Sequence, residues 1–546
     1  MRTYRSGSTC KGMSEIDNEK NKNRKMSVFV TTDTFHGRKI KIPETEFTGF
    51  SFRKLLAFAG PGFLVSIAYL DPGNIESDLQ SGSIAQYKLL WILLISTCLG
   101  LFMQTLAAKL GIVSGMHLAE ICYYQYRKIP RFVVWIMVEV AVIGSDIQEI
   151  IGTAIAIYML SNRVIPLWGG CLITIVDTIT FLLLDNFGLR ILEFFFIILI
   201  SVMGISFGYE YVIAGPNQSE VLQGMFVPWC SNCDSTVWLQ AVGVVGAVIM
   251  PHNFYLHSAL VKSRDIDRNK HEKIEDARLY NFIENAIALL VSFIINTFVV
   301  SVFGYGLYQT TGNEAIANCE AKGINVTGIF EANDEYISAD LYIGGIFLSC
   351  TFGMAAMYIW AIGLLACGQS STMSGTYTGQ FTMEGFLNLK ISRWKRILIT
   401  RNIAIIPTFF IAFFNNIEDM TRMNDIINIL MSIQLPFAAL PLIAATSNTA
   451  LMGKYANSRS TKISALMLSV VIFFMNLYSV YASFDSTMAW YWSLLLYIGV
   501  VLYIIIIIYL FVHTLTYLDS KRISKINFIK KYVLVEEEKI KLWGSN

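Results

Sequence analysis

The chain has 546 residues, of which 54% are hydrophobic and 15% are charged, with a formal net charge of +2. Soluble proteins carry about 25% charged residues, so this composition excludes an ordinary set of soluble domains. Apolar stretches of about 20 residues, the length that crosses a hydrocarbon core, recur along the chain. We therefore predict an all-α polytopic membrane protein.

The first 51 residues are polar and rich in Lys and Arg, and no apolar run precedes Phe52. This composition is typical of a disordered tail, which we expect in the cytosol at residues 1–51. No cleavable signal peptide is visible there, so we expect the first span to direct the chain to the membrane.

Hydropathy and helix breakers predict 11–12 transmembrane helices after this tail. The uncertainty in number arises because the last two spans are the least clearly separated. A second cytosolic tail is expected at 514–546. The approximate spans are 52–82, 87–112, 132–160, 164–184, 191–213, 236–262, 280–306, 339–367, 397–415, 424–450, 463–484 and 488–513.

Lys and Arg are distributed unevenly among the loops. Segment 262–278 is strongly basic, whereas segment 214–235 has neither residue and segment 306–338 has only Lys322. Because basic loops remain in the cytosol, both termini are predicted to be cytosolic if the spans number twelve. The basic segment is expected to face anionic lipid and not nucleic acid. Nothing in the sequence indicates an obligate protein partner.

The two basic-poor loops carry candidate modification sites. Asn217 and Asn325 each begin an Asn-X-Ser/Thr tripeptide, the acceptor pattern for N-glycosylation. The same two loops contain Cys230, Cys233 and Cys319, which could form a disulfide whose pairing is open. Free thiols are the alternative interpretation.

Two predicted spans contain helix breakers. Asp-Pro-Gly-Asn at 71–74 interrupts the first span, and Met-Pro-His-Asn at 250–253 interrupts the sixth. A proline has no N–H and its ring clashes with the preceding turn, so both helices should open there. In a helix each N–H bonds the carbonyl four residues back, so the carbonyls of Ala68 and Ala247 lose their donors. In hydrocarbon this is costly unless another group, such as a cation, binds them.

The side chains beside these carbonyls suggest which ion would bind. Asp71 offers a carboxylate, Asn74 an amide oxygen and Met250 a thioether. Oxygen cages suit Mg²⁺ and Ca²⁺, whereas a soft thioether favours transition metals. Either motif alone could be an ordinary kink with packing residues. Both motifs together with an intramembrane Asp favour a metal site.

Two broken spans at corresponding positions are typical of an inverted-repeat transporter with its site near the bilayer midplane. The predicted fold is therefore a 5+5 inverted repeat with two additional peripheral helices. The corresponding domains are the repeats 52–213 and 236–450, the extracytosolic loop 214–235, and the peripheral helices within 451–513.

Three motifs resemble the signatures of the natural resistance-associated macrophage protein (NRAMP) family, and in particular its eukaryotic divalent metal transporter branch. They are the tetrapeptide at 71–74, Ala-Val-Ile-Met-Pro-His-Asn at 247–253, and the Ser-, Thr- and Gly-rich stretch at 368–386. The resemblance extends from about Phe52 to the twelfth span. It implies a LeuT-like fold and proton-coupled uptake of Mn²⁺ and Fe²⁺, with no cofactor and no enzymatic activity.

The resemblance also implies a ligand set. Alignment on Gln-Leu-Pro at 434–436 places a polar ligand of the tenth span at Asn428, where many bacterial members have Gln. The Ala68 carbonyl would suit a different conformation of the site. Relatives that carry Mg²⁺ lack the methionine, so Met250 indicates the transition-metal branch. The remaining implied ligands are Asp71, Asn74 and the Ala247 carbonyl.

Acidic residues form a stripe on the third span. Glu139, Asp146 and Glu149 are spaced by seven and three residues, so they share one helix face. Ionisable groups inside a bilayer usually face a wet or protein-lined path, and Arg401 in the ninth span is the expected partner. With the family resemblance added, the candidate proton-pathway residues are Asp71, Asp146, Glu149, Arg401, His252, His257 and Glu139.

A coupling hypothesis follows from these groups. An empty Asp71 carboxyl in a low-dielectric site is expected to hold a proton, which an arriving dication would expel. The proton could then leave through the acidic stripe and Arg401. The structural alternative is that the acidic groups pair with Arg401 merely to lock helices together.

Two rival functions stay open at this stage. A carrier for Ca²⁺, Mg²⁺ or an amino acid would share the fold, and a metal-sensing receptor would bind without turnover. The tails leave room for a receptor, although they contain no recognisable signalling domain. The expected location is the plasma membrane or an endosomal or vacuolar membrane.

Overall fold

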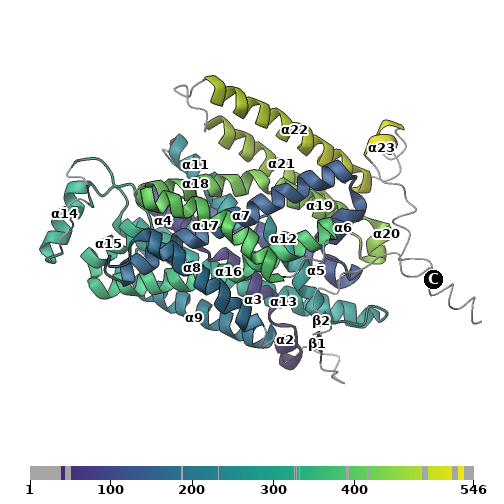
Figure 1. Ribbon diagram of the computed structural model, residues 1–546, viewed down its shortest axis with the longest axis horizontal. Helices are drawn as coiled ribbons and strands as arrows, with labels where there is room; N and C mark the ends of the chain where they lie inside the picture. Colours follow the sequence, from purple (N-terminus) through teal and green to yellow (C-terminus); the bar gives the residue numbers. More distant parts are fainter. Residues whose placement is uncertain are drawn as a thin grey trace, which may run out of the picture.

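The computed structural model describes residues 39–42, 51–185, 189–231, 233–324, 326, 329–330, 333–388, 393–414, 417–482, 490–518 and 527–533. The described chain is mostly helical, and many of its helices run along the long axis of the molecule (Figure 1). Nine helices of 22 to 36 residues within these ranges are long and apolar enough to cross a membrane. The predicted all-α polytopic fold is confirmed.

The elements of the first half begin with a short strand and a broken helix. They are β1 (Ile40–Lys41), α2 (Phe52–Phe58), α3 (Pro61–Ser66), η1 (Ile67–Tyr69), α4 (Pro72–Ala85), α5 (Leu90–Ser114), α6 (Leu118–Gln125), α7 (Lys128–Leu160), α8 (Leu167–Asp185), α9 (Leu189–Ala214) and α10 (Gln218–Phe226).

The second half begins with another broken helix. Its elements are α11 (Ser235–Val248), α12 (His252–Leu260), η2 (Val261–Ser263), β2 (Arg264–Asp265), α13 (His271–Gly306), α14 (Gly312–Ala321), α15 (Leu341–Phe352), α16 (Met354–Leu387), α17 (Arg393–Phe414), α18 (Ile417–Gln434), α19 (Pro436–Ser447), α20 (Thr449–Met452), η3 (Gly453–Tyr455), α21 (Arg459–Ala482), α22 (Trp490–Leu518) and α23 (Asn527–Tyr532).

Both predicted helix breaks are present. Asp71 has an extended backbone (φ −74°, ψ 164°) between η1 and α4. In the sixth span α11 ends at Val248, and α12 begins at His252 after Pro251. Helix α4 packs against α11 while α3 packs against α12. The two broken segments therefore lie side by side in opposite directions, as an inverted repeat requires.

The eighth span differs from its predicted range of 339–367. Helix α15 ends at Phe352, directly before Gly353, whose φ of +98° favours glycine, and the separate helix α16 continues to Leu387. The hydropathy prediction ended this span at residue 367, too early, because the residues that follow are rich in Ser and Thr. Many of these side chains are buried and bond their own helix, as Thr378 Oγ1 does to the Ser374 carbonyl at 2.7 Å. The polar stretch packs against α7 along with the rest of α16.

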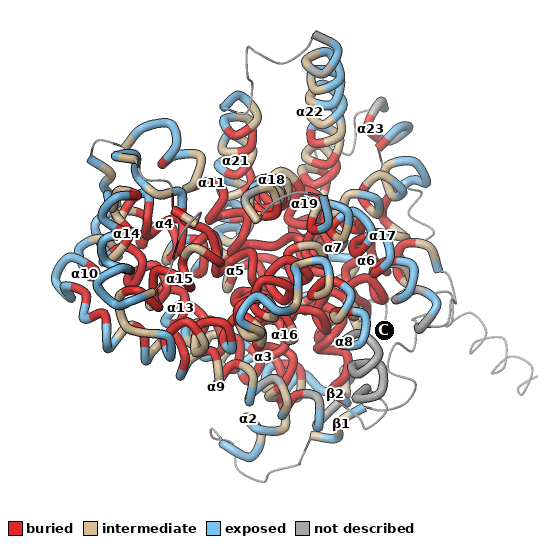
Figure 2. Tube along the Cα trace, turned by 60° about the vertical axis from the view of Figure 1, so that its left-hand side comes forward, coloured by how far each residue is buried: buried red, intermediate tan, exposed pale blue. Residues whose placement is uncertain are grey.

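Helices α21 and α22 stand apart from the buried centre of the molecule (Figure 2). An 18-residue window of α22 is 11% buried inside the protein, compared with 78% for α7. Both helices contact α19. They are the two peripheral helices that the sequence predicted.

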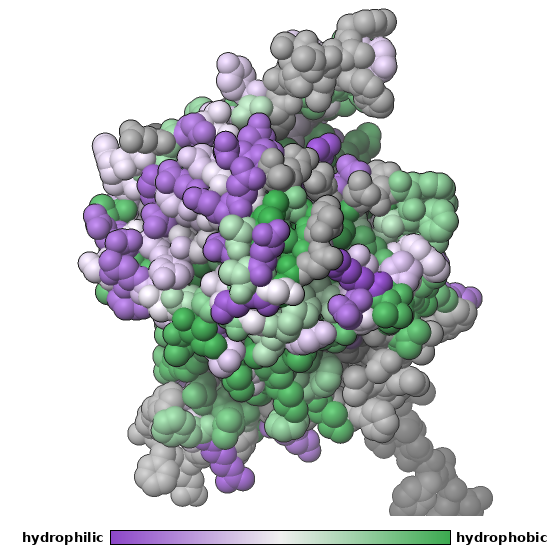
Figure 3. Space-filling view, turned by 90° about the vertical axis from the view of Figure 1, so that its left-hand side faces the viewer, coloured by the Kyte–Doolittle hydropathy of each residue, from purple (hydrophilic) through white to green (hydrophobic). Residues whose placement is uncertain are grey.

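The two ends of the molecule are formed by different elements. Strands β1 and β2, α20 and α23 lie toward one end, and α14 lies at the other (Figure 1). Viewed from the α14 end, hydrophilic side chains gather over the upper part of this face, and hydrophobic ones predominate below them (Figure 3). Strand β1 pairs in parallel with β2, so a segment of the N-terminal tail is fixed beside the end of the sixth span.

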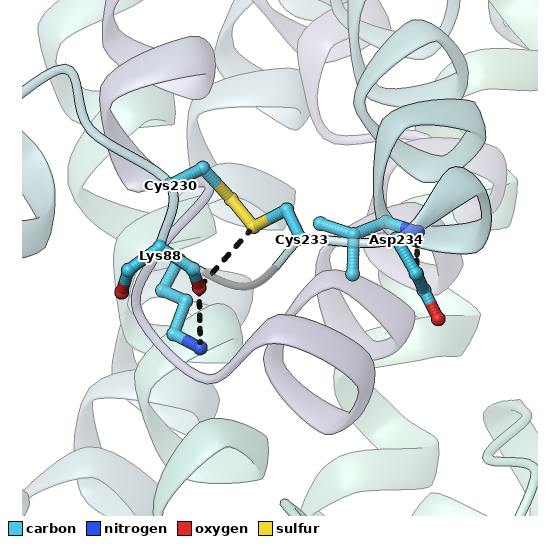
Figure 4. The surroundings of a disulfide bond; sticks show 6 residues. Lys88, Cys230, Cys233 and Asp234 are labelled. Atoms are coloured by element: carbon cyan, nitrogen blue, oxygen red, sulfur yellow. Dashed lines mark hydrogen bonds between the residues drawn. A yellow bond between two sulfur atoms is a disulfide. The ribbon is translucent and has the colours of Figure 1, made fainter.

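Two disulfides resolve the cysteine pairing that the sequence left open. Cys230 pairs with Cys233 in the loop before α11, close to Lys88 (Figure 4). Cys319 of α14 pairs with Cys350 of α15, across 31 positions of sequence. Cys350 was not a candidate because it lies in an apolar run, whereas the prediction considered cysteines of polar loops.

Candidate functional site

The first helix break holds two oxygen atoms that have no hydrogen-bond partner among the described residues. Asp71 Oδ1 accepts from the backbone N–H of Asn74 at 2.9 Å and from its side-chain amide at 2.7 Å. Asp71 Oδ2 and Asn74 Oδ1 are buried, and no described residue donates to either oxygen. Buried oxygens without donors are costly, so this pair is suited to bind a cation.

The Ala68 carbonyl accepts a hydrogen bond, whereas the sequence analysis predicted that it would lack a donor. Pro72 removes its backbone donor, but Asn74 Nδ2 donates to this oxygen at 3.2 Å. A metal ion could use the Ala68 carbonyl after Asn74 releases it. Its role as a ligand in another conformation stays a prediction.

The second break brings its own candidate ligands into the same region. Ala247 and Met250 are at most 1% exposed, and Pro251 offers no N–H to the Ala247 carbonyl. A Cβ on Gly246 would overlap the backbone carbonyl oxygen of Asn428. Helix α11 therefore approaches the backbone of α18 directly, one residue before Ala247.

Asn428 links three helices beside this site. Its Nδ2 donates to the Gly73 carbonyl at 3.3 Å, and its Oδ1 accepts from Gln148 Nε2 at 2.7 Å. The predicted ligand oxygen is therefore held by an amide of α7. Gln148 was missed from the sequence because it is a neutral residue within the acidic stripe, between Asp146 and Glu149.

The acidic stripe meets its predicted cation. Arg401 donates to Glu149 Oε2 at 3.0 Å and lies 3.8 Å from Asp146 Oδ1. Its guanidinium also donates to the Thr372 carbonyl at 3.3 Å. All three charged groups are buried, and a Cβ on Gly375 would lie 2.7 Å from Asp146 Oδ1. Two carboxyl groups here share one guanidinium, so a bound proton would neutralise the excess negative charge.

The remaining predicted proton-pathway residues lie on α7 and α12. Glu139 Oε1 accepts from Trp135 Nε1 at 2.9 Å and from Thr382 Oγ1 at 3.0 Å. His252 and His257 are fully buried on α12, and their ring nitrogens have no hydrogen-bond partner in the described part of the chain. Helix α12 packs against both α7 and α16.

Two further carboxylates were missed by the sequence analysis. Glu76 and Asp78 are fully buried in α4, a turn or two beyond Asp71. Glu76 Oε2 accepts from the Asn424 amide of α18. The signal was available, because any acidic residue inside a predicted span is a functional candidate. In this span the sequence analysis considered only the Asp-Pro-Gly-Asn motif and the carbonyl of Ala68, so it did not name the two carboxylates that follow.

A cavity of about 210 Å³ reaches Asn428 from the α14 end of the molecule. Gln240 Nε2 donates to the Ser77 carbonyl at 2.9 Å and so connects α11 to α4 along its wall. The residues that line this cavity include Ser77 and Gln80 of α4, Thr236 and Gln240 of α11, Asp425 and Asn428 of α18, and Ser338 before α15.

The opposite end is closed by a buried arginine. Arg264 is 1% exposed and donates to the Ala59 carbonyl at 2.6 Å and the Phe58 carbonyl at 3.3 Å. It also pairs with Glu193 of α9 at 2.9 Å. These contacts tie the end of the sixth span to the start of the first span and to the fifth.

Within the described ranges no three His, Cys, Asp or Glu side chains gather closely enough to hold a metal ion. The candidate site is therefore the mixed set at the breaks, with one carboxylate, amide oxygens, a carbonyl and a thioether. Together with the inverted repeat, this arrangement defines a secondary transporter of LeuT-like fold.

The comparisons identify the family. A family model described as natural resistance-associated macrophage protein-like matches residues 62–482. The chain is 57% identical over 521 residues to Protein Malvolio of Drosophila melanogaster, covering 94% of this chain and 87% of that protein. It is 57% identical over 447 residues to natural resistance-associated macrophage protein 2 of Homo sapiens, covering 82% and 79%. The chain belongs to the Nramp family, which confirms the resemblance noted in the sequence.

Solved structures agree with this assignment. A manganese transporter of Eremococcus coleocola is 28% identical, with a TM-score of 0.74, and the match covers 90% of this chain and 99% of that one. A nucleobase-cation-symport-1 family transporter is 11% identical with a TM-score of 0.50, covering 88% and 95%. The second likeness concerns the fold alone.

The contact between Gln148 and Asn428 leads to a prediction about metal affinity. Replacing Gln148 with Ala should weaken Mn²⁺ binding about tenfold, as expected when a residue that orients a ligand is lost. Titration calorimetry on the purified protein measures this. Gln223→Ala, at an exposed position on α10, is the matched control. Equal affinities for the two variants would show that Gln148 does not position the site.

Proposed function

We propose that this protein is a proton-coupled symporter that carries divalent transition-metal ions such as Mn²⁺ and Fe²⁺ into the cytosol. The observation that carries the proposal is a pair of buried oxygens at a helix break, Asp71 Oδ2 and Asn74 Oδ1, to which the described residues supply no donor. The manganese transporter of Eremococcus coleocola, a relative in structure, supports this substrate class.

The proposed ligands combine hard and soft atoms. Asp71 and Asn74 supply oxygens, Ala247 supplies a carbonyl, and Met250 supplies sulfur. The soft sulfur favours Mn²⁺ and Fe²⁺ over Ca²⁺ and Mg²⁺, which prefer oxygen throughout. Asn428 joins the set when its oxygen turns from Gln148 to the ion. The Ala68 carbonyl would replace a ligand in another conformation.

The proposed proton route begins at the metal site. An arriving dication favours the ionised form of Asp71 and displaces its proton. Asp146 and Glu149 share Arg401, so the buried cluster has more negative than positive charge when both carboxyl groups are ionised. Either group can therefore accept that proton, which neutralises the excess negative charge. His252, His257 and Glu139 lie on α12 and α7 and are proposed as further steps or as tuning groups.

Transport further requires that the two ends of the path open in turn. The cavity above Asn428 provides access from the α14 end, while Arg264 closes the other end. We propose that release of the ion breaks the contacts of Arg264 with Glu193 and with the carbonyls of Phe58 and Ala59. The structure would then represent the state that is open toward the outside.

The proposed orientation places the α14 end outside and both termini in the cytosol, in a plasma, endosomal or vacuolar membrane. Asn217 is exposed at the start of α10, where its side chain caps the helix by accepting from the Ser219 N–H at 3.2 Å. It is accessible for glycosylation, which stays a proposal. Asn325 lies outside the described residues. The tails 1–51 and 514–546 would both face the cytosol.

Uptake into sealed vesicles tests the function directly. Proteoliposomes containing the purified protein should accumulate radioactive Mn²⁺, and an inward proton gradient should increase the initial rate. A metal-sensing receptor would bind Mn²⁺ without accumulating it. If the rate of accumulation does not depend on the proton gradient, proton coupling is refuted, but metal transport is still supported.

Met250 should act as the filter against Ca²⁺. In Met250→Ala the remaining ligands are oxygens, so Ca²⁺ should compete with Mn²⁺ uptake more strongly than in the unchanged protein. Met250→Cys keeps a sulfur atom and should retain part of the discrimination. Met357→Ala, which truncates a buried methionine of α16, controls for the loss of packing. Unchanged Ca²⁺ competition in Met250→Ala would count against a soft-ligand site.

Asp146 should be needed for proton movement. Asp146→Asn cannot release or accept a proton, so metal-driven proton uptake into vesicles should fall strongly while Mn²⁺ binding persists. Glu320→Gln, at an exposed position on α14, is the control variant. If proton uptake is the same in both variants, the acidic cluster is a structural lock and the proton takes another route.

A further inference from the structure

A second cavity lies at the end of the molecule opposite α14, and none of its lining residues belongs to the proposed metal or proton path. It has a volume of about 340 Å³ and is lined by the ends of α5 and α13 and by the segment that joins α20 to α21. Its lining includes Lys109, Glu275, Arg278, Lys454, Tyr455 and Ser458.

The cavity has more positive than negative charge. Its one carboxylate among these residues, Glu275, pairs with Arg278 at 3.0 Å. Within the described residues, no carboxylate lies at ion-pair distance from Lys109 or Lys454. Lys109 is partly buried, and its ammonium donates to Asn457 Oδ1 at 2.9 Å. An ammonium carries three donors, so further oxygen atoms can bind there.

The start of α21 adds a second attraction for anions. Ser458 lines the cavity directly before this 24-residue helix, and its Oγ accepts from the Thr461 N–H at 3.2 Å. The other N–H groups of a first helical turn have no partner within the helix, and the helix dipole makes this end positive. Lysines together with a helix N-terminus suit the oxygens of a phosphate group.

The walls of the cavity continue onto surface that would face the bilayer. Phe282 lies four residues beyond Arg278, hence on the same face of α13, and is 45% exposed. Leu279 lies four residues beyond Glu275, another lining residue, hence on the same face of α13, and is 52% exposed. A phosphate in the cavity therefore has exposed apolar side chains beside it, as a lipid with a headgroup and acyl chains needs.

We propose that this cavity binds the phosphorylated headgroup of an anionic lipid, with Lys109, Lys454 and the start of α21 contacting the phosphate oxygens. Basic pockets between transmembrane helices on the cytoplasmic side bind such headgroups. The lipid would bridge α21, a peripheral helix, to α5 and α13. The site is independent of metal binding, so its test needs no transport activity.

Binding of a fluorescent phosphatidylinositol bisphosphate to the full-length protein in detergent tests the site, with fluorescence anisotropy as the readout. Lys454→Gln should lower the affinity about fivefold, and Lys109→Gln combined with it should lower the affinity further. Lys128→Gln removes an exposed charge at the start of α7 and should leave the affinity unchanged. Lys454→Gln alone keeps the test valid if the partly buried Lys109 proves necessary for folding.

Competition separates the two sources of phosphate. Unlabelled phosphatidylinositol bisphosphate should displace the probe, whereas phosphatidylcholine should not. Soluble inositol trisphosphate should compete weakly, because it lacks the acyl chains that rest on the exposed apolar residues. Equal competition by inositol trisphosphate would overturn the lipid assignment in favour of a free phosphate. Equal affinities in the double variant and in Lys128→Gln would overturn the site itself.

Discussion

The structure depends on two backbone N–H groups that are missing at Pro72 and Pro251. Without them neither the first nor the sixth span can continue as one helix, and polar backbone must remain inside the membrane. The packing of α4 on α11 and α3 on α12 places the two breaks side by side. The breaks thereby create a polar centre in a protein whose surroundings are apolar, and the side chains beside them determine which ion can enter it.

Charge balance explains why the buried acidic residues are tolerated. Burying an ionised group is costly unless another charge or a hydrogen bond compensates it. Arg401 offsets one of the two carboxylates on α7, and Asp71 is partly satisfied by Asn74. With its carboxyl groups ionised, each site therefore carries excess negative charge. Protons and metal dications are the species that can supply the balancing positive charge, which is a physical reason to couple their movements.

The sequence predicted those parts of the fold that follow from strong local signals. Proline within an apolar run marks a break, and acidic residues at spacings of three and seven mark one face, so Asp71 and the partners of Arg401 could be found. Hydropathy failed at α16, because its many Ser and Thr side chains bond their own helix and pack against α7. The roles of Gln148 and Cys350 depend on residues distant in sequence, Asn428 and Cys319, and no local pattern reveals such pairs.

The exposed position of α22 has a mechanical consequence. Few residues of its most apolar window are buried, so much of its surface would be solvated by acyl chains, and it contacts the rest of the protein mainly through α19. Helix α19 directly follows α18, the helix that bears Asn428. A thinner or thicker bilayer tilts a lipid-exposed helix to match its length. Strain from such a mismatch would thus reach the ion-binding centre through α19, and membrane composition would influence how readily the carrier turns over.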